Sequence, residues 1–307
     1  MLGFLVRRLL QAAFVVLVVT LLVAWAVRLS GDPAVMLAQG AGSINAQDLI
    51  NIREGLGLDR PFSAQYFGFI GGMLTGDMGR SFMGGTSVGL LVAQALPRTL
   101  LLAVSGLGLA IIIAIPLGVH AAVKKGAAAD QVIRIVSLLG LSVPNFWLAL
   151  MLVLIFGITL RWLPPSGAEG PLSLVMPTVT LAIILAASNV RLVRSAMLDT
   201  LSAQYIMVAR SKGLRDRVVL YKHALANCAI PLLTYLGLQF GGLIGGALVI
   251  ERVFNWPGMG SLAFDAVSSR DYPVLQAVVT VLAAMIVLVN LAIDVLYRLV
   301  GPRIRKE

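Results

Sequence analysis

The stretch PVLQAVVTVLAAMIVLVNLAI, residues 273–293, contains twelve Val, Leu and Ile residues and no charged residue. As an α-helix it spans about 30 Å, which matches the thickness of the hydrocarbon core of a bilayer. At about −0.3 to −0.6 kcal/mol each, its Val, Leu and Ile side chains favour insertion by roughly 5 kcal/mol before the polar residues are counted. The stretch therefore predicts a transmembrane helix.

Further charge-free runs of similar length precede it. They comprise approximately residues 9–27, 99–119, 135–160, 172–190 and 228–250. Across the chain 59% of residues are apolar and 12% are charged, and the mean hydropathy is +0.93. Because these values lie outside the range of soluble globular proteins, we predict an all-α polytopic membrane protein with about six transmembrane helices.

The first run has an alternative interpretation as a secretory signal. Arg7 and Arg8 precede it, and Ala24-Trp25-Ala26 is similar to a cleavage site with small residues. However, the run is longer than the apolar part of a typical signal, about 7–15 residues, and further spans follow it. An uncleaved first helix is therefore favoured.

The distribution of Lys and Arg indicates the orientation of the chain. With the N-terminus inside, the inner segments hold 16 of the 24 basic residues and five of the 14 acidic residues. Cytoplasmic segments of membrane proteins carry an excess of Lys and Arg, so both termini are predicted to be cytoplasmic. This asymmetry accounts for the net charge of +10 without nucleic-acid binding, which we do not expect.

We expect the chain to be organised in three regions. Residues 1–28 form an N-terminal segment and the first span, residues 29–98 an external loop segment with short helices, and residues 99–307 the core with the second to sixth spans. Within the core, residues 191–227 form a cytoplasmic loop. Residues 191–223 carry nine formal charges, and each costs about 2.5 kcal/mol to insert, so this part cannot cross the membrane.

The sequence carries no recognisable catalytic apparatus. It has no GxxxxGK[ST] phosphate-binding motif, and His120 and His223 are too few and too isolated for a metal site. The predicted spans hold no Asp, Glu, Lys or Arg, which are the groups that ion-coupled transporters usually place at their coupling sites. We therefore predict a transport protein that is not an enzyme and has no cofactor or metal of its own. An ATP-independent secondary transporter or channel stays an alternative, and a membrane enzyme is a third, weakly supported one.

Amide side chains in or beside the predicted spans are candidates to line a polar pathway: Asn145, Asn189 and Gln239. Hydrogen bonding between helices is the alternative for each.

On the predicted outer side, the segment ERVFNWPGMGSL, residues 251–262, indicates a rigid turn. Its residues Asn255, Trp256, Pro257 and Gly258 are candidate contacts for an external protein, with an aromatic anchor at the membrane interface as the alternative.

The cytoplasmic loop carries the most informative motif, YIMVARSKGLRDRVVLYKHALANCAIP, residues 205–231. Its pattern YxxxARxKGL…HAL…N…P resembles the conserved EAA loop of binding-protein-dependent ABC importer permeases, in the form found in the peptide and nickel branch. The segments GDPA, LGLDRPFSAQY, SVPNFW, QFGGLIGGALVIERVFNWPGMG and DVLYRLVGPRIR extend this resemblance over nearly the whole chain. Met207 and Val208 stand where the general loop has its first acidic residue and the residue after it, a departure that removes the carboxylate from this position and leaves the docking role intact.

The resemblance implies the type I ABC importer permease fold, in a subunit of the bacterial inner membrane. It implies a second, homologous permease subunit, two cytoplasmic ATPase subunits or domains that bind ATP and Mg²⁺, and an external solute-binding protein. The residues that it assigns to ATPase coupling are Tyr205, Ala209, Arg210, Lys212, Gly213, Leu214, His223 and Pro231, with small Ala209 allowing close approach and Gly213 allowing the chain to turn. Peptides are the leading substrate class, with glutathione and nickel complexes as alternatives.

Overall fold

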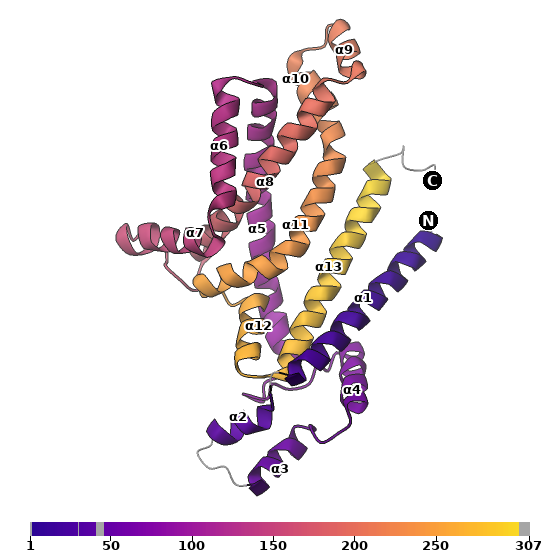
Figure 1. Ribbon diagram of the computed structural model, residues 1–307, viewed down its shortest axis with the longest axis vertical. Helices are drawn as coiled ribbons and strands as arrows, with labels where there is room; N and C mark the ends of the chain where they lie inside the picture. The colour runs from indigo at the N-terminus through magenta and orange to yellow at the C-terminus, as the bar shows by residue number, and fades with distance from the viewer. Residues whose placement is uncertain (1, 30, 41–45, 301–307) are drawn as a thin grey trace. The chain divides into compact units, whose positions relative to one another are not determined.

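The computed structural model describes residues 2–29, 31–40 and 46–300. Helices joined by turns make up this part of the chain, and its β-structure is limited to an isolated bridge between Arg80 and Ser87. Figure 1 follows the helices in chain order. They form two compact units: residues Met1–Thr99 with Pro257–Leu288, and residues Leu100–Trp256 with Val289–Glu307.

The first unit contains the N-terminal helices and the beginning of the last one. Its elements are α1 (Leu2–Leu29), α2 (Pro33–Gly40), α3 (Ala46–Gly55), α4 (Phe62–Thr75), the first part of α5 (Val88–Val123), α12 (Met259–Ser268) and most of α13 (Tyr272–Val300). Its core joins α5, α12 and α13 through side chains that include Val88, Met259 and Val278. The backbone N–H of Met259 donates to Thr99 Oγ1 at 2.7 Å, so the start of α12 is fixed to α5.

The second unit contains the helices around the predicted cytoplasmic loop. Its elements are the rest of α5, α6 (Ala128–Ser142), α7 (Asn145–Leu152), the π-helical η1 (Val153–Thr159), the 3-10 turn η2 (Pro171–Leu174), α8 (Val175–Leu201), α9 (Gln204–Ser211), α10 (Asp216–Val218), the π-helical η3 (Val219–Ala224) and α11 (Leu225–Val253). Three apolar clusters hold them together: one beneath α9, one around the end of α11 and a small one between α5 and α8.

The number of membrane spans agrees with the sequence. Helices Val6–Leu29, Val88–Val123, Pro171–Leu201 and Tyr272–Val295 are long and apolar enough to cross a membrane. The bent pairs Ala128–Ser142 with Asn145–Thr159, and Asp216–Ala229 with Pro231–Leu243, raise this number from four to six if each pair is one span. Each of these segments overlaps one of the six predicted runs, and the helices confirm the all-α polytopic prediction for the described residues. The cytoplasmic location of the termini stays a prediction.

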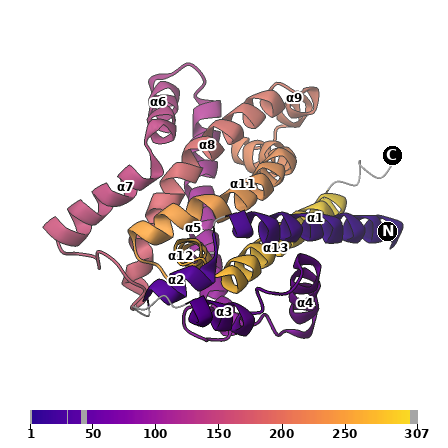
Figure 2. The same cartoon turned by 60° about the horizontal axis from the view of Figure 1, so that its bottom comes forward.

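The third predicted run, residues 135–160, differs from a straight helix. The chain turns by 98° between α6 and α7, and Figure 2 shows α7 leaving α6 at a steep angle. Val143 is extended, with φ −80° and ψ 125°, because the proline that follows it disfavours helical backbone. Pro144 has no N–H to continue α6, and its carbonyl instead accepts from Leu148 N at 3.1 Å at the start of α7. One uninterrupted apolar run therefore gives two helices.

Candidate functional site

The predicted coupling segment lies between the two long helices α8 and α11. It consists of α9, α10 and η3, and only Ser202 and Ala203 separate α9 from α8. Figure 1 shows α9 beyond the end of α8. The residues assigned to coupling from Tyr205 to Leu214 thus lie together, on one short helix and the turn that follows it.

One face of α9 packs against the rest of the second unit. Ile206 and Ala209, three residues apart and so on the same helical face, are both buried. Their cluster contains Val119 of α5, Val193 and Met197 of α8, and further side chains of η3 and α11: Val219, Ala224, Cys228 and Leu232. The small side chain of Ala209 therefore allows α9 to approach helices of its own chain.

The turn after α9 has the hydrogen bonds of a Schellman motif. Gly213 N donates to Arg210 O at 2.9 Å, and Leu214 N donates to Ala209 O at 3.4 Å. This pairing requires a residue with left-handed backbone after the helix. Gly213 adopts φ +75°, a conformation that costs glycine little because it has no Cβ. The glycine thus ends α9 and directs the chain toward α10.

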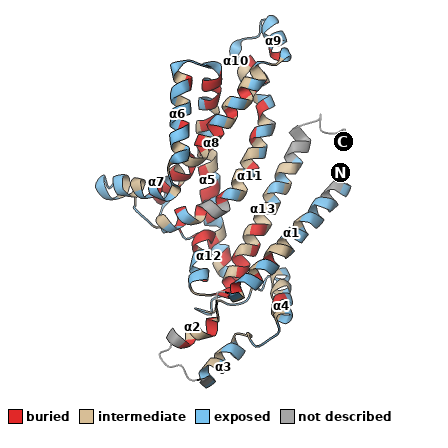
Figure 3. Cartoon of the chain, in the orientation of Figure 1, coloured by how far each residue is buried: buried red, intermediate tan, exposed pale blue. Residues whose placement is uncertain are grey.

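The other face of α9 is exposed and partly apolar. Met207 is 68% exposed, and Tyr205, Val208 and Leu214 are exposed as well. Figure 3 shows that most of α9 is coloured as exposed. Exposed apolar side chains grouped on one short element are a candidate contact surface for a partner. These four residues, Tyr205, Met207, Val208 and Leu214, form the coupling face.

Basic residues border the coupling face. Arg210 and Lys212 are exposed, and Arg210 Nε lies 3.8 Å from Asp216 Oδ1. Since both side chains of this pair are largely exposed, the ion pair contributes little to stability. Both basic groups are thus available to an acidic surface on a partner.

The last two residues assigned to coupling lie further along the chain. His223 is half-buried in η3, and its carbonyl accepts from Asn227 Nδ2 at 2.7 Å. Pro231 lies inside α11, where the axis of the bent pair turns by 50°. Neither residue belongs to the coupling face, and both lie where the loop joins α11.

The structure brings two of the three candidate pathway amides into one region. Gln239 Nε2 of α11 donates to Ser188 Oγ of α8 at 2.9 Å, and Ser188 precedes Asn189. Asn189 is fully buried, and within the described part of the chain neither its Nδ2 nor its Oδ1 has a hydrogen-bond partner; the same holds for Gln239 Oε1. Asn145, by contrast, is half-buried at the start of α7.

Sequence reasoning missed an ion pair next to this region. Arg194 Nε and Nη2 donate to the two carboxylate oxygens of Asp130 at 2.6 and 2.8 Å, and Gly126 N donates to the same carboxylate at 2.9 Å. The pair joins the first turn of α6 to α8. Its partners lie 64 residues apart in sequence, so the sequence shows the charge of each residue but not the contact between them. An acidic residue at the start of a span, on the basic side of the protein, was the available signal.

The predicted external turn is half buried and half exposed. Asn255 has φ +49°, and the backbone N–H of Trp256 donates to Glu251 O at 2.7 Å. The Trp256 side chain is buried in the cluster around the end of α11. Of the four residues assigned to an external contact, Asn255 and Pro257 are exposed, whereas Trp256 and Gly258 are buried.

Comparison with known proteins identifies the family. Residues 114–306 match the family described as binding-protein-dependent transport system inner membrane component, and residues 1–103 match the N-terminal region of such components. The chain is 39% identical over 306 residues to the glutathione transport system permease protein GsiC of Salmonella typhi, and 37% identical over the same length to GsiC of Escherichia coli strain K12. Each alignment covers 99% of both chains.

The fold has a solved counterpart. The structure matches a chain of the inward-facing MetNI methionine ABC transporter with a TM-score of 0.58 and 18% identity, covering 69% of this chain and 97% of the other.

The fold and the matched sequences define a class, the type I permease subunits of ABC importers. Within this class the chain belongs to the family of inner membrane components of binding-protein-dependent transport systems. It is a multi-pass protein of the inner membrane. The resemblance drawn from the loop motif and the segments around it is confirmed.

Proposed function

We propose that this permease subunit imports glutathione or a similar peptide, together with a second related permease, two cytoplasmic ATPase subunits and an external solute-binding protein. The relatives that are 37–39% identical over their full length are named for glutathione transport, which supports this substrate class. ATP and Mg²⁺ bind to the ATPase subunits in this proposal, and no residue of the permease acts as a catalyst.

The observation that carries the proposal is the coupling face. Its apolar side chains lie on the segment that follows α8 and precedes α11, and positive-inside topology predicts that this segment is cytoplasmic. Apolar residues at the centre and charged residues at the rim are the usual arrangement of a protein interface. We infer that an ATPase subunit covers the coupling face, with Arg210 and Lys212 at the rim.

The packing of α9 supports a role in transmitting movement. ATP binding draws the ATPases together, and a displacement of α9 then acts on the ends of α5, α8 and α11, because Ile206 and Ala209 are packed among them. Interiors packed this closely transmit displacement with little compression. The helices thereby switch between inward-open and outward-open arrangements.

On the predicted outer side, the exposed residues Asn255 and Pro257 are our candidates for the contact with the solute-binding protein. Trp256 supports this turn from beneath through its burial in the apolar cluster. We therefore assign Trp256 to the stability of the turn, and the contact to its exposed neighbours.

The test is transport by the reconstituted complex. The permease, its partner permease, the ATPases and the binding protein are placed in proteoliposomes, and uptake of radiolabelled glutathione is measured with and without ATP. We expect uptake only with ATP and with binding protein, and no ATP hydrolysis by the permease alone. Unlabelled dipeptides, tripeptides and a nickel chelate serve as competitors that rank the substrate classes.

The outcomes separate the parts of the proposal. Uptake without ATP contradicts the ATP-driven mechanism. ATP-dependent uptake of a dipeptide or a nickel chelate, with glutathione excluded, contradicts the substrate class and keeps the mechanism.

A further inference from the structure

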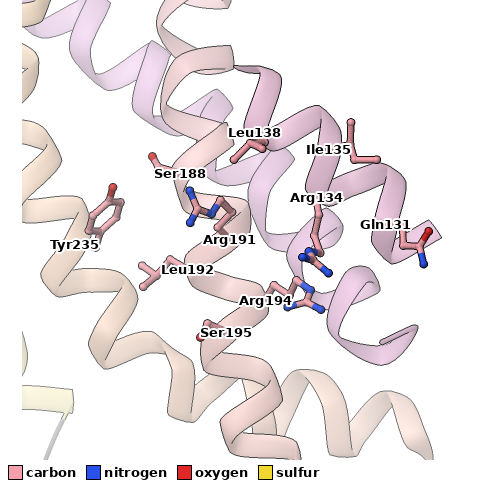
Figure 4. Close-up of a pocket in the computed structure, with 10 residues that line it drawn as sticks. All are labelled: Gln131, Arg134, Ile135, Leu138, Ser188, Arg191, Leu192, Arg194, Ser195 and Tyr235. Atoms are coloured by element: carbon pink, nitrogen blue, oxygen red, sulfur yellow. The ribbon is translucent and has the colours of Figure 1, made fainter. Parts of the chain in front are cut away.

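A cavity of about 940 Å³ lies among α6, α8 and α11 in the second unit. Its lining contains Arg134 of α6 and Arg191 and Arg194 of α8, and no acidic residue is among the residues that line it. Figure 4 shows the Arg134 side chain pointing from α6 toward that of Arg194, and Tyr235 pointing from α11 toward α8. The cavity is therefore basic on one side and has a phenol on the other.

The helical register places these groups on facing surfaces. On α8, Ser188, Arg191 and Ser195 have the spacing i, i+3 and i+7, and on α6 Gln131 and Arg134 are three residues apart. Residues at these spacings lie on the same face of a helix. The polar lining thus lies on one face of each helix, where it alternates with the apolar side chains of Ile135, Leu138 and Leu192.

The ion pair distinguishes one arginine from the other two. Arg194 is bound by both carboxylate oxygens of Asp130, so its charge is compensated and its position is fixed. Arg134 follows Asp130 by one helical turn, and Arg191 precedes Arg194 by nearly one turn. Within the described residues neither Arg134 nor Arg191 forms a salt bridge. Two cationic groups therefore border the cavity without a bound carboxylate.

A guanidinium group binds carboxylates with a specific geometry. Its planar fork of N–H donors matches the two oxygens of a carboxylate, and these charge-assisted hydrogen bonds are stronger than neutral ones. Arg134 and Arg191 are exposed, so they are accessible to a ligand that enters the cavity.

Further polar atoms lie beside the cavity. Ser188 lines the cavity and accepts the hydrogen bond from Gln239, which lies one turn from Tyr235 on α11. The buried Gln239 Oε1 and both side-chain polar atoms of Asn189 have no hydrogen-bond partner among the described residues. Gln239 and Asn189 are not among the residues that line the cavity, so these unpaired atoms mark a polar region beside it, where buried groups still lack the partners they nearly always have.

The size and location of the cavity fit a small solute in transit. Its volume is in the range of small-molecule sites, about 300–1,000 Å³. Ser195 lies six residues before the end of α8, which is about 9 Å along the axis, and α9 follows that end. The cavity therefore lies near the predicted cytoplasmic mouth of the pathway.

We propose that Arg134 and Arg191 bind a carboxylate of the transported solute in this cavity, so that the permease itself favours anionic, peptide-like substrates. This inference rests on the proposed function, because it requires that a peptide-like solute passes through the chain. Tyr235 supplies a further hydrogen-bond donor on the opposite wall. Ser188 Oγ, on the adjacent wall, already donates to Leu185 O and accepts from Gln239 Nε2.

The experiment measures binding of radiolabelled glutathione, which carries two carboxylates, to the complete permease–ATPase complex in nanodiscs of neutral phosphatidylcholine, without binding protein. Equilibrium dialysis at millimolar concentrations compares wild type with the double variants Arg134→Gln/Arg191→Gln and Arg134→Lys/Arg191→Lys. The matched control is Lys124→Gln/Lys125→Gln, which removes the same charge from exposed positions outside the cavity. Glutathione diethyl ester, whose carboxylates are blocked, is the second probe.

We expect saturable binding to wild type, a loss of tenfold or more for the glutamine variant, a smaller loss for the lysine variant, and a change below twofold for the control. The diethyl ester should bind at least tenfold more weakly than glutathione. Co-purification of the ATPases confirms that each variant is assembled. The proposal is overturned if wild type shows no saturable binding, if the glutamine variant binds like wild type, or if the ester binds like glutathione.

Two further measurements separate the alternatives. Adding phosphatidylglycerol to the nanodiscs should leave glutathione binding unchanged, and loss of binding in its presence would assign the cavity to lipid headgroups instead. In the uptake assay, normal ATP-driven import by the glutamine variant overturns this inference but leaves the proposed function standing. Absence of import by wild type rejects the proposed function itself.

Discussion

Two turns of this molecule have the same backbone motif but differ in whether the apolar residue of the turn is exposed or buried. After α9, Gly213 is left-handed and Leu214 N reaches back to Ala209 O; after α11, Asn255 is left-handed and Trp256 N reaches back to Glu251 O. Leu214, however, is 40% exposed, whereas Trp256 is 4% exposed. The motif ends a helix in both places, and the apolar residue that follows the left-handed position decides the role of the turn. One turn offers an apolar side chain to a partner, and the other places it in the core.

The largest expected effect concerns the buried turn. Trp256→Ala leaves a cavity in the cluster around Phe254 and Ile250, and removal of a buried Trp side chain costs about 3–5 kcal/mol. We expect a clear drop in the melting temperature of the purified complex and in membrane abundance. Pro257→Ala, at the exposed neighbouring position, is the control and should change neither. Equal stability of Trp256→Ala and wild type would show that the turn is not held by this side chain.

The second prediction concerns the exposed turn and its helix. Val208→Glu places a carboxylate in the coupling face, and a buried unpaired charge at an interface costs several kcal/mol. Co-purification of the ATPases should fall by tenfold or more while membrane abundance stays normal. Ile206→Glu, on the buried face of the same helix, should instead lower abundance. If Val208→Glu retains its ATPases and transports normally, the coupling face is not the docking surface.

The third prediction compares the two left-handed residues. Gly213→Ala should destabilise α9 by about 1–2 kcal/mol, because left-handed backbone is costly for a residue with a Cβ. A Cβ at this glycine meets no atom within 4 Å, so the cost is conformational, and Gly213→Asn should be milder. Asn255→Gly should be neutral or slightly stabilising. Hydrogen exchange of the Gly213 and Leu214 amides measures the effect, and a Gly213→Ala variant with unchanged exchange would contradict it.

The smallest effect is expected at the rim of the coupling face. Arg210→Gln removes an exposed ion pair with Asp216, and such pairs contribute about 0–1 kcal/mol. The melting temperature should hardly change, and ATPase affinity should fall by less than about fivefold, with a weaker dependence on salt. A loss of ATPase affinity as large as that of Val208→Glu would show that Arg210, and not the apolar residues, lies at the centre of the interface.

Hydrophobic runs predicted the spans because each apolar residue of a run contributes to the free energy of membrane insertion, and the summed contribution of a run is large. The bend at Pro144 was not predicted, since proline is tolerated in transmembrane helices and the run around it is unbroken. Only the three-dimensional structure shows that Val143 is extended and that α7 leaves α6 at 98°.

The candidate site was partly accessible from sequence. The loop motif located the segment that forms α9, but it did not indicate which residues of this helix are buried. Which face is buried depends on α5, α8 and α11, and those contacts are distant in sequence. The same limit applied to Trp256, whose sequence context fits an exposed anchor as well as a core residue, and to the pairing of Asp130 with Arg194.

The seating of α9 on three helix ends has a mechanical consequence. Only Ser202 and Ala203 link α8 to α9, and Ile206 and Ala209 are buried against α5, α8 and α11. In the mechanism that we propose, movement of the loop therefore displaces the ends of these helices. Variants that loosen this junction should then hydrolyse ATP without transport.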